Sequence, residues 1–189
     1  MFYGEFVHLR LPEMEDATVM TEQFNDFETR KFLNMMFPVS VKQEEDFILD
    51  VHKRFQEKTG YHFVIENKEH DYLGSVGLGS ISNIDRKASV GIAITNKKFW
   101  GQGYGTDAMR TICAIGFQIV NLHRIELDVH EFNKRAIRSY EKVGFTKIGQ
   151  KRESNWIDGK YVDSIIMDIL AREFEEKYGH VDLTGFSPY

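Results

Sequence analysis

The sequence has little cysteine, little proline and no long apolar run. Its one cysteine among 189 residues, Cys113, cannot form an internal disulfide, which points to a reducing compartment. The longest mostly apolar stretch, residues 111–122, is too short to span a bilayer. The first residues show no basic start followed by an apolar run, so no secretory signal is visible. We therefore expect a cytoplasmic protein with no membrane partner.

An excess of positive charge and a cluster of metal ligands are also missing. The net charge is −5 and the isoelectric point lies near 5.8, which argues against nucleic acid as a main partner. The seven histidines are scattered and no H-E-x-x-H or Cys/His spacing occurs, so we expect no metal site. Hydrophobic residues make up 42% of the chain, which is enough to build a core without disulfides or metal.

No linker divides the chain, so we expect a single domain over residues 1–189. Hydrophobic periodicity predicts a mixed α/β domain with the element order β-αα-βββ-α-β-α-ββ. The predicted strands cover residues 5–11, 61–66, 72–81, 87–95, 124–130, 146–155 and 160–169, and the predicted helices cover residues 13–27, 41–58, 103–120, 134–143 and 171–178. Ser40 with Gln43 marks a helix start, Gly144 a helix end, and Asp158-Gly159 a hairpin turn. The three strands between 61 and 95 form an antiparallel meander in this interpretation.

A glycine-rich turn at residues 99–108 is the most informative stretch of the sequence. It follows a predicted strand and opens the predicted helix at 103–120, with glycine at positions 101, 103 and 105. Alternate glycines let backbone N–H groups approach a ligand closely, and a helix N-terminus favours an anionic group, most often phosphate. We therefore expect a phosphate-bearing ligand here, and a plain tight turn is the alternative.

A dinucleotide is one possible ligand of this turn. Gly103, Gly105 and Ala108 satisfy the pattern G-x-G-x-x-A, and Glu126 lies near the place of a ribose-binding acid. However, several elements precede the turn, the strands before it look antiparallel, and Glu126 lies inside a predicted strand. No G-x-x-x-x-G-K-[ST] occurs, which disfavours a nucleoside triphosphatase. The dinucleotide hypothesis therefore stays as the weaker one.

Several spaced motifs together carry a family resemblance. The runs at 90–94 and 100–108 are followed by a third run, Asn133 to Phe145, that fits the pattern N-x-x-A-I-x-x-Y-x-K-x-G-F. These motifs resemble the acetyl-CoA site of the GNAT superfamily of N-acetyltransferases, and the closing hairpin resembles its RimJ/RimL-like and spermidine-acetyltransferase branches. The resemblance covers roughly residues 5–170, leaving a short C-terminal helix and tail at 171–189. It implies a mostly antiparallel central sheet flanked by helices.

The resemblance implies acetyl-CoA as the ligand and gives its parts particular positions. The pantetheine arm would pair with the strand at Ile92, Ala93, Ile94 and Thr95. The pyrophosphate would lie on the backbone amides of Gln102, Gly103, Tyr104, Gly105 and Thr106. Asn133 matches the position that usually hydrogen-bonds the cofactor arm. Trp100 departs from the pattern, because many members carry Arg or Gln there, and one side-chain contact to the phosphates is then missing.

The resemblance also implies catalytic roles. Tyr140 matches the usual general acid, and a phenol with a pKa of about 10 can protonate a departing thiolate whose conjugate acid has a pKa of about 8.5. Ser89 stands where relatives often carry a glutamate base, and a serine could only hold a water that relays the proton. Other base candidates share one face of the next strand: His130 has a suitable intrinsic pKa, and Asp128 could bind a cationic amine.

We expect the chain to move an acetyl group from acetyl-CoA to a primary amine by direct attack in a ternary complex. The sequence offers no convincing nucleophile for a covalent acyl-enzyme. A strand amide such as that of Ile94 could stabilise the developing oxyanion. The acceptor stays open between a protein N-terminus, a polyamine and another small amine, as does the choice between monomer and homodimer. A non-catalytic acetyl-CoA-binding module is the alternative function, since Ser89 replaces the expected base.

Overall fold

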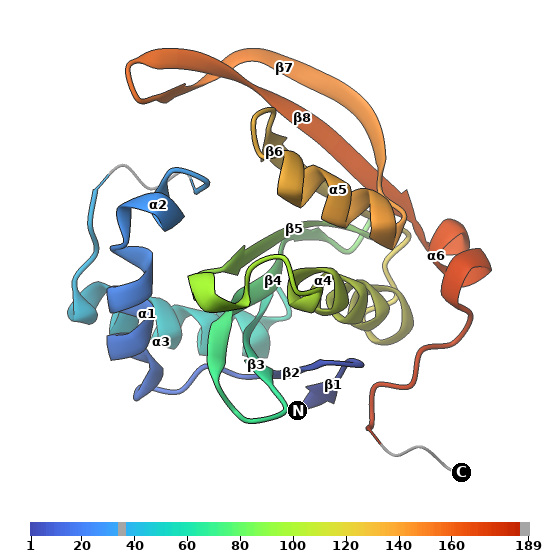
Figure 1. Ribbon diagram of the computed structural model, residues 1–189. Coiled ribbons are helices and arrows are strands. Elements are labelled where there is room, and N and C mark those ends of the chain that lie inside the picture. Colours follow the sequence, from blue (N-terminus) through green and yellow to red (C-terminus); the bar gives the residue numbers. More distant parts are fainter. Residues whose placement is uncertain (34–36, 186–189) are drawn as a thin grey trace.

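The computed structural model describes residues 1–33 and 37–185. Within these residues, eight strands form one sheet in the order β1-β2-β3-β4-β5-β6-β8-β7 (Figure 1). The strands are Phe2–Tyr3 (β1), Val7–Arg10 (β2), Tyr61–Asn67 (β3), Tyr72–Ser82 (β4), Lys87–Ile94 (β5), Arg124–His130 (β6), Thr146–Ile157 (β7) and Lys160–Leu170 (β8). Neighbouring strands are antiparallel except β5 and β6, which are parallel. The predicted mixed, mostly antiparallel sheet is confirmed.

Helices cover both faces of this sheet. They are Asp16–Phe24 (α1), Phe27–Arg30 (α2), Val41–Glu57 (α3), Tyr104–Ala114 (α4), Lys134–Val143 (α5) and Ala171–Tyr178 (α6), with a 3₁₀ turn at Lys97–Phe99 (η1) and a π-helical turn at Ile115–Ile119 (η2). Among the described residues, no helix has the length and apolar character needed to cross a membrane.

Helix α4 covers one face of the sheet, where it contacts β2, β4, β5 and α5. The large side chains of β4 and β5 point to this face, because Val76, Leu78 and Val90 belong to the same core cluster as Ile112 of α4. Gly105 at the start of α4 lies close to Ile94, where an added Cβ would meet Ile94 Cγ1 at 3.3 Å. The main hydrophobic core therefore lies between α4 and the sheet.

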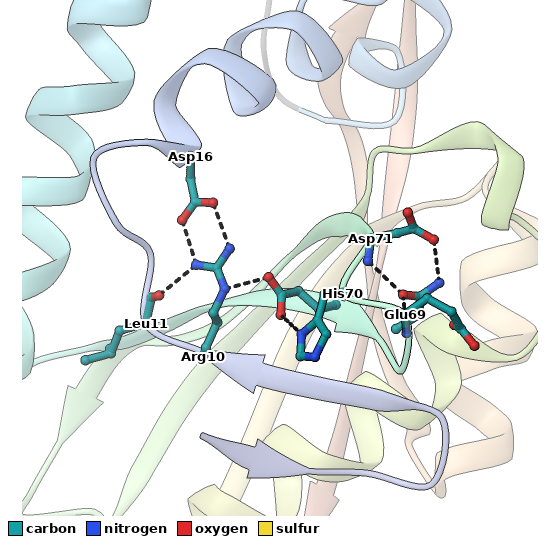
Figure 2. A network of polar contacts seen from close by, with 8 residues as sticks. Arg10, Leu11, Asp16, Glu69, His70 and Asp71 are labelled. Atoms are coloured by element: carbon teal, nitrogen blue, oxygen red, sulfur yellow. Dashed lines mark hydrogen bonds and ion pairs between the residues drawn. The ribbon is translucent and has the colours of Figure 1, made fainter.

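Helices α1 and α3 pack on each other and cover the opposite face, where α3 contacts β3. Arg10 on β2 fixes the start of α1 through two hydrogen bonds to the Asp16 carboxylate, at 2.7 and 2.8 Å (Figure 2). The same guanidinium donates from Nε to Glu66 Oε1 on β3 at 2.6 Å. Because breaking a buried ion pair leaves an uncompensated charge, this network holds α1 in place against the sheet.

Strands β5 and β6 separate soon after they meet. They pair at Lys87 with Arg124, Ala88 with Ile125 and Ser89 with Glu126, and β5 continues for five more residues without a partner in β6. The crossover between the two strands contains the glycine-rich turn and α4. The gap between them is the structural basis of the site described below.

Short-range sequence signals located several boundaries correctly. Ser40 accepts a hydrogen bond from the Gln43 N–H while the Gln43 side chain bonds the Ser40 N–H, so the predicted capping box opens α3. Gly144 ends α5 with a φ of 119°, a conformation that favours glycine. Asp158 and Gly159, both with positive φ, turn the last hairpin. Figure 1 shows that the turn end of β7–β8 extends beyond the rest of the sheet.

Other boundaries were wrong. The helix predicted at 13–27 is shorter, Asp16–Phe24 (α1), because Asn25 hydrogen-bonds the backbone of Val39 and Asp26 accepts from the Thr29 N–H to begin a separate helix, α2. The helix predicted at 103–120 is α-helical only to Ala114 and continues as the π-helical turn. Strand β1 was missed, since two residues carry no periodicity and its pairing with β2 is a tertiary contact.

Candidate active site

A cavity of about 850 Å³ lies at the gap between β5 and β6. On the α4 face it is lined by the glycine-rich turn and by α5; on the opposite face it is lined by β3, β4 and β5 beneath α1, α2 and α3. The predicted site residues that line it are Ser89, Ile92, Ala93, Ile94, Gly103, Gly105, Thr106, Asp128, His130, Asn133 and Tyr140. Elements far apart in the sequence therefore meet in one cavity that reaches both faces of the sheet.

The edge of β5 that faces the gap presents backbone groups that β6 does not pair beyond Ser89. The Thr95 N–H donates to the Leu73 carbonyl at 2.9 Å, next to β4, and the hydrogen bonds to one neighbour alternate along an antiparallel strand. The N–H and C=O groups of Val90, Ile92 and Ile94 therefore point away from β4, toward β6. The Ile94 carbonyl accepts from Trp100 Nε1 at 2.6 Å. The remaining groups on this edge are placed to pair with an extended, amide-containing ligand.

The glycine-rich turn forms the second wall of the cavity. Gly101 and Gly103 have φ values of 77° and 95°, a conformation that favours glycine. An added Cβ at either would meet no atom within 4 Å, so the space beside the turn is open. In the described part of the chain no side chain caps the N-terminus of α4. The Thr106 and Asp107 N–H groups donate to the Gly103 carbonyl, both at 3.0 Å, and the N–H groups before them have no partner inside the helix. This arrangement suits an anionic group such as a phosphate.

Cations from α5 stand beside this turn. Arg135, Arg138 and Lys142 line the cavity. The Arg135 guanidinium lies 3.8 Å from the centre of the Trp100 ring and 5.6 Å from that of Phe32, and no carboxylate pairs with it among the described residues. A cation held by aromatic rings and free of a counter-ion is suited to meet the charge of a bound anion. Lys97 differs, because Asp26 and Glu28 bind it at 2.8 and 3.0 Å.

Two residues of the α5 motif have defined surroundings. Asn133 caps α5 through Oδ1, which accepts from the Ala136 N–H at 3.2 Å, and its Nδ2 has no hydrogen-bond partner among the described residues. Tyr140 is buried in the cavity wall, and burial raises the pKa of Tyr140 to about 12, with the Arg135 charge acting in the opposite direction. The phenol therefore keeps its proton at neutral pH and can act as a donor.

The predicted base candidates have different environments. Ser89 Oγ donates to the Gly79 carbonyl at 3.1 Å, so its lone pairs can accept a hydrogen bond from a water. His130 is buried and stacked on Phe132, burial lowers its pKa, and its Nδ1 has no hydrogen-bond partner among the described residues. Asp128 is exposed and bound by Lys151 at 2.9 Å. All three line the cavity, and each role stays a prediction.

Three predicted cofactor-binding residues lie outside the lining of the cavity. Thr95 is buried, and its Oγ1 donates to Gln23 Oε1 at 2.6 Å. Gln102 donates from Nε2 to the Lys98 carbonyl at 2.6 Å, and the Tyr104 ring packs edge-on against Phe99. Their side chains are engaged elsewhere, so any contact from Gln102 or Tyr104 to the ligand falls to the backbone amide.

Sequence reasoning missed the part of the cavity beneath α1, α2 and α3. Arg54 and His62 line it, although neither belongs to a motif with recognisable spacing. A usable signal was present in the strands: small residues alternate along both β4 and β5, at Ser75, Gly77, Gly79, Ser89, Gly91 and Ala93. A strand face without large side chains leaves room above the sheet.

Comparisons with known proteins agree with this geometry. A family model described as "Acetyltransferase (GNAT) domain" matches residues 7–146. The uncharacterized N-acetyltransferase p20 of Bacillus licheniformis is 30% identical over 173 residues, covering 91% of this chain and 97% of that protein. The spermidine N(1)-acetyltransferase of Vibrio cholerae is 31% identical over 122 residues, 65% of this chain and 70% of that protein. A crystal structure of the spermidine N-acetyltransferase from Vibrio cholerae, in complex with CoA and spermine, has a TM-score of 0.81 and 27% identity, covering 89% of this chain and 97% of that one.

Proposed function

The chain belongs to the GNAT family of acetyltransferases, which transfer an acetyl group from acetyl-CoA to an amine, and we propose that it does so in the cavity between β5 and β6. The observation that carries this proposal is the juxtaposition of two features. The β6-facing edge of β5 presents backbone groups that β6 does not pair beyond Ser89, and the buried Tyr140 belongs to the wall of the same cavity. A thioester-bearing arm laid along this edge would place its sulfur within the reach of α5.

The glycine-rich turn and α5 are suited to the anionic end of acetyl-CoA. The N-terminus of α4 would bind the pyrophosphate through backbone amides, and Arg135 would approach it from α5. Asn133 Nδ2 would donate to a carbonyl of the pantetheine arm, while the Ile92 and Ile94 edge would pair with its amides. These assignments divide the cavity into a phosphate end on the α4 face and an acceptor end beneath α1, α2 and α3.

The reaction is a direct transfer. The neutral amine attacks the thioester carbonyl, a C–N bond forms, and a strand amide such as that of Ile94 stabilises the oxyanion. The C–S bond then breaks and Tyr140 gives its proton to the departing thiolate. The amine nitrogen, cationic after the attack, loses one proton through a water that Ser89 can hold, and a proton from solvent restores the Tyr140 phenol. No covalent acyl-enzyme is needed, and the thiol of Cys113 is buried with a raised pKa.

Replacement of the Tyr140 hydroxyl tests this mechanism. We expect Tyr140→Phe to lower kcat about 100-fold, because a positioned proton donor contributes that order of rate, with the KM for acetyl-CoA nearly unchanged. The measurement is thiol release from acetyl-CoA in the presence of an amine. Wild-type kcat/KM for the amine should rise from pH 7 to 9.5 as the amine deprotonates, with no decline from Tyr140, whose pKa is about 12.

Tyr161→Phe is the matched control, because this tyrosine is 62% exposed at the turn end of the β7–β8 hairpin. Its kinetics should equal those of the wild type. Full turnover in Tyr140→Phe would remove Tyr140 from its role. Binding of acetyl-CoA without turnover of any amine would instead favour a non-catalytic acetyl-CoA-binding module.

The proposal also includes the class of acceptor, the cellular location and the oligomeric state. The acceptor is a primary amine: a protein N-terminus, a polyamine or another small amine. We place the enzyme in the cytoplasm, because its single cysteine is buried and the chain uses no disulfide. It acts as a monomer or homodimer, and sedimentation of the purified chain distinguishes the two.

A further inference from the structure

The acceptor end of the cavity has a floor of small residues. On the face of β4 and β5 beneath α1 and α3, three cross-strand pairs lie side by side: Ser75 with Ala93, Gly77 with Gly91, and Gly79 with Ser89. All six residues line the cavity, while the larger side chains between them point to α4. The floor provides room for an acceptor and offers it no charged group.

His62 forms one polar wall above this floor. It pairs with Gly77 across β3 and β4, and its ring lies over that glycine, where an added Cβ would be 2.6 Å from Nδ1. Its ring packs edge-on against Phe47 of α3, and Nε2 is buried with no hydrogen-bond partner among the described residues. Burial lowers the pKa of His62 to about 4, so the ring is neutral at pH 7 and offers Nε2 as a hydrogen-bond donor in one tautomer.

Arg54 of α3 lines the same end of the cavity. Its guanidinium lies 5.7 Å from the centre of the Phe47 ring, the ring that also contacts His62. Nη2 binds Asp50 at 2.7 Å, but Nε is buried with no hydrogen-bond partner among the described residues. Two unsatisfied polar nitrogens therefore belong to neighbouring side chains at one end of an otherwise apolar space. A buried polar group without a partner calls for a ligand, because leaving it unpaired is costly.

The charged side chains that line the cavity favour some classes of acceptor over others. The remaining side chains at this end are mostly apolar, including Phe24, Leu33 and Val51. In the described part of the chain, the cavity is lined by one carboxylate, Asp128, which lies on β6 and is bound by Lys151. A polyamine with one nitrogen at the thioester would leave its other ammonium groups beside Arg54, whose neighbouring carboxylate, Asp50, is already bound by Nη2 at 2.7 Å. Bringing further cations next to a guanidinium is unfavourable.

We propose that the acceptor is a primary amine that also carries a carboxylate, and that Arg54 and His62 bind this carboxylate. The inference rests on the proposed function and narrows its acceptor class. The Arg54 guanidinium supplies the positive charge that pairs with the carboxylate, His62 supplies a hydrogen-bond donor, and the amine at the other end of the molecule points over the floor toward the gap between β5 and β6. The specificity differs from that of a polyamine acetyltransferase, although the fold is shared.

A matched series of acceptors tests this specificity. Glycine, 4-aminobutyrate and 6-aminohexanoate are compared with the alkylamine and the diamine of equal length, together with spermidine, by CoA release at saturating acetyl-CoA. We expect kcat/KM of the best amino acid to exceed that of its matching diamine by roughly tenfold or more, as expected for one charge-assisted hydrogen bond. A diamine or spermidine that equals or exceeds every amino acid overturns the proposal.

Variants assign the effect to the two side chains. Arg54→Gln should lower kcat/KM for the amino acid roughly tenfold through a higher KM, and should leave the alkylamine unchanged. Arg54→Glu should reverse the preference in favour of the diamine. Lys53→Gln is the matched control, since it removes the same charge from an exposed position of α3 that does not line the cavity. His62→Gln should retain more activity than His62→Phe, because glutamine keeps a donor.

The outcomes separate this proposal from the one on which it rests. Suppose that acetyl-CoA raises the Tm and some amine is acetylated, but Arg54→Gln changes kcat/KM for the amino acid and the alkylamine equally. The proposed carboxylate site is then wrong, while the acetyltransferase activity is retained as the function. If acetyl-CoA neither binds nor turns over with any member of the series, the proposed function itself fails. A Tm measured for each variant shows whether a loss of activity is a loss of folding.

Discussion

Trp100 shows how one aromatic residue can position a cation beside the glycine-rich turn. In the structure the ring is anchored by Nε1, which donates to the Ile94 carbonyl, and its face is covered by the Arg135 guanidinium at 3.8 Å. The tryptophan therefore holds a cation of α5 beside the glycine-rich turn.

Removal of this guanidinium should weaken cofactor binding. We expect Arg135→Ala to raise the KM for acetyl-CoA roughly tenfold with a smaller change in kcat, because a charge-assisted contact to phosphate is lost while Tyr140 stays in place. Steady-state kinetics with varied acetyl-CoA measure the effect. Lys134→Ala is the control, since this neighbouring cation is exposed and does not line the cavity. An unchanged KM in Arg135→Ala would contradict the assignment.

At the residue scale, the sequence predicted one half of the site better than the other. Asn133 and Tyr140 were found through the family resemblance of the run from Asn133 to Phe145, which lies on one short helix and its ends. His62 and Arg54 have no such relation, since β3 and α3 bring them together only through tertiary packing on Phe47. For that reason the acceptor end of the cavity could not be predicted from the sequence.

The same contrast holds for whole elements. The start of α3, the end of α5 and the last hairpin were predicted because their signals, Ser40, Gly144 and Asp158-Gly159, act within a few residues. The separation of β5 from β6 could not be predicted, because the pairing of these two strands is a contact between distant parts of the chain. The gap that holds the candidate site therefore depends on the least local contacts of the fold.

Strand β4 offers a test at this scale, because two of its glycines face the same cavity under different constraints. A Cβ at Gly77 would lie 2.6 Å from His62 Nδ1 and 2.9 Å from the Tyr61 carbonyl, whereas a Cβ at Gly79 would be 3.8 Å from Ser89 Oγ. We expect Gly77→Ala to lower the free energy of unfolding by about 1–3 kcal/mol, since the ring and backbone must shift. Gly79→Ala should change it by less than about 0.5 kcal/mol.

Urea denaturation of both variants measures this difference. Gly77→Ala should also impair the acceptor end, raising the KM for the amine more than the KM for acetyl-CoA, because His62 is displaced. Equal stability of the two variants would show that the His62 ring moves freely, and would weaken the case for its role as a fixed binding group.

At the scale of the whole molecule, the charge of the cavity lining is opposite in sign to the net charge of the chain. The chain carries a net charge of −5, yet the charged side chains that line the cavity are Arg54, Arg135, Arg138, Lys142 and one carboxylate, Asp128, in the described residues. A concave wall of one sign concentrates the field and attracts a ligand of the opposite sign. Acetyl-CoA carries several negative charges, so the acidic exterior and the cationic cavity together direct it to the site.

This field should make cofactor binding sensitive to salt. The Debye length falls from about 10 Å at 0.1 M to about 3 Å at 1 M, so added salt screens the cavity at the distance from which acetyl-CoA approaches. We expect the KM for acetyl-CoA to rise roughly fivefold between 0.05 and 0.5 M NaCl, with kcat changing much less, because Tyr140 and the β5 edge are buried and poorly screened. The double variant Arg138→Gln, Lys142→Gln should have a higher KM at low salt and a flatter dependence. A KM for acetyl-CoA that is independent of salt in the wild type would mean that neutral contacts along β5, rather than the cations of α5, account for cofactor binding.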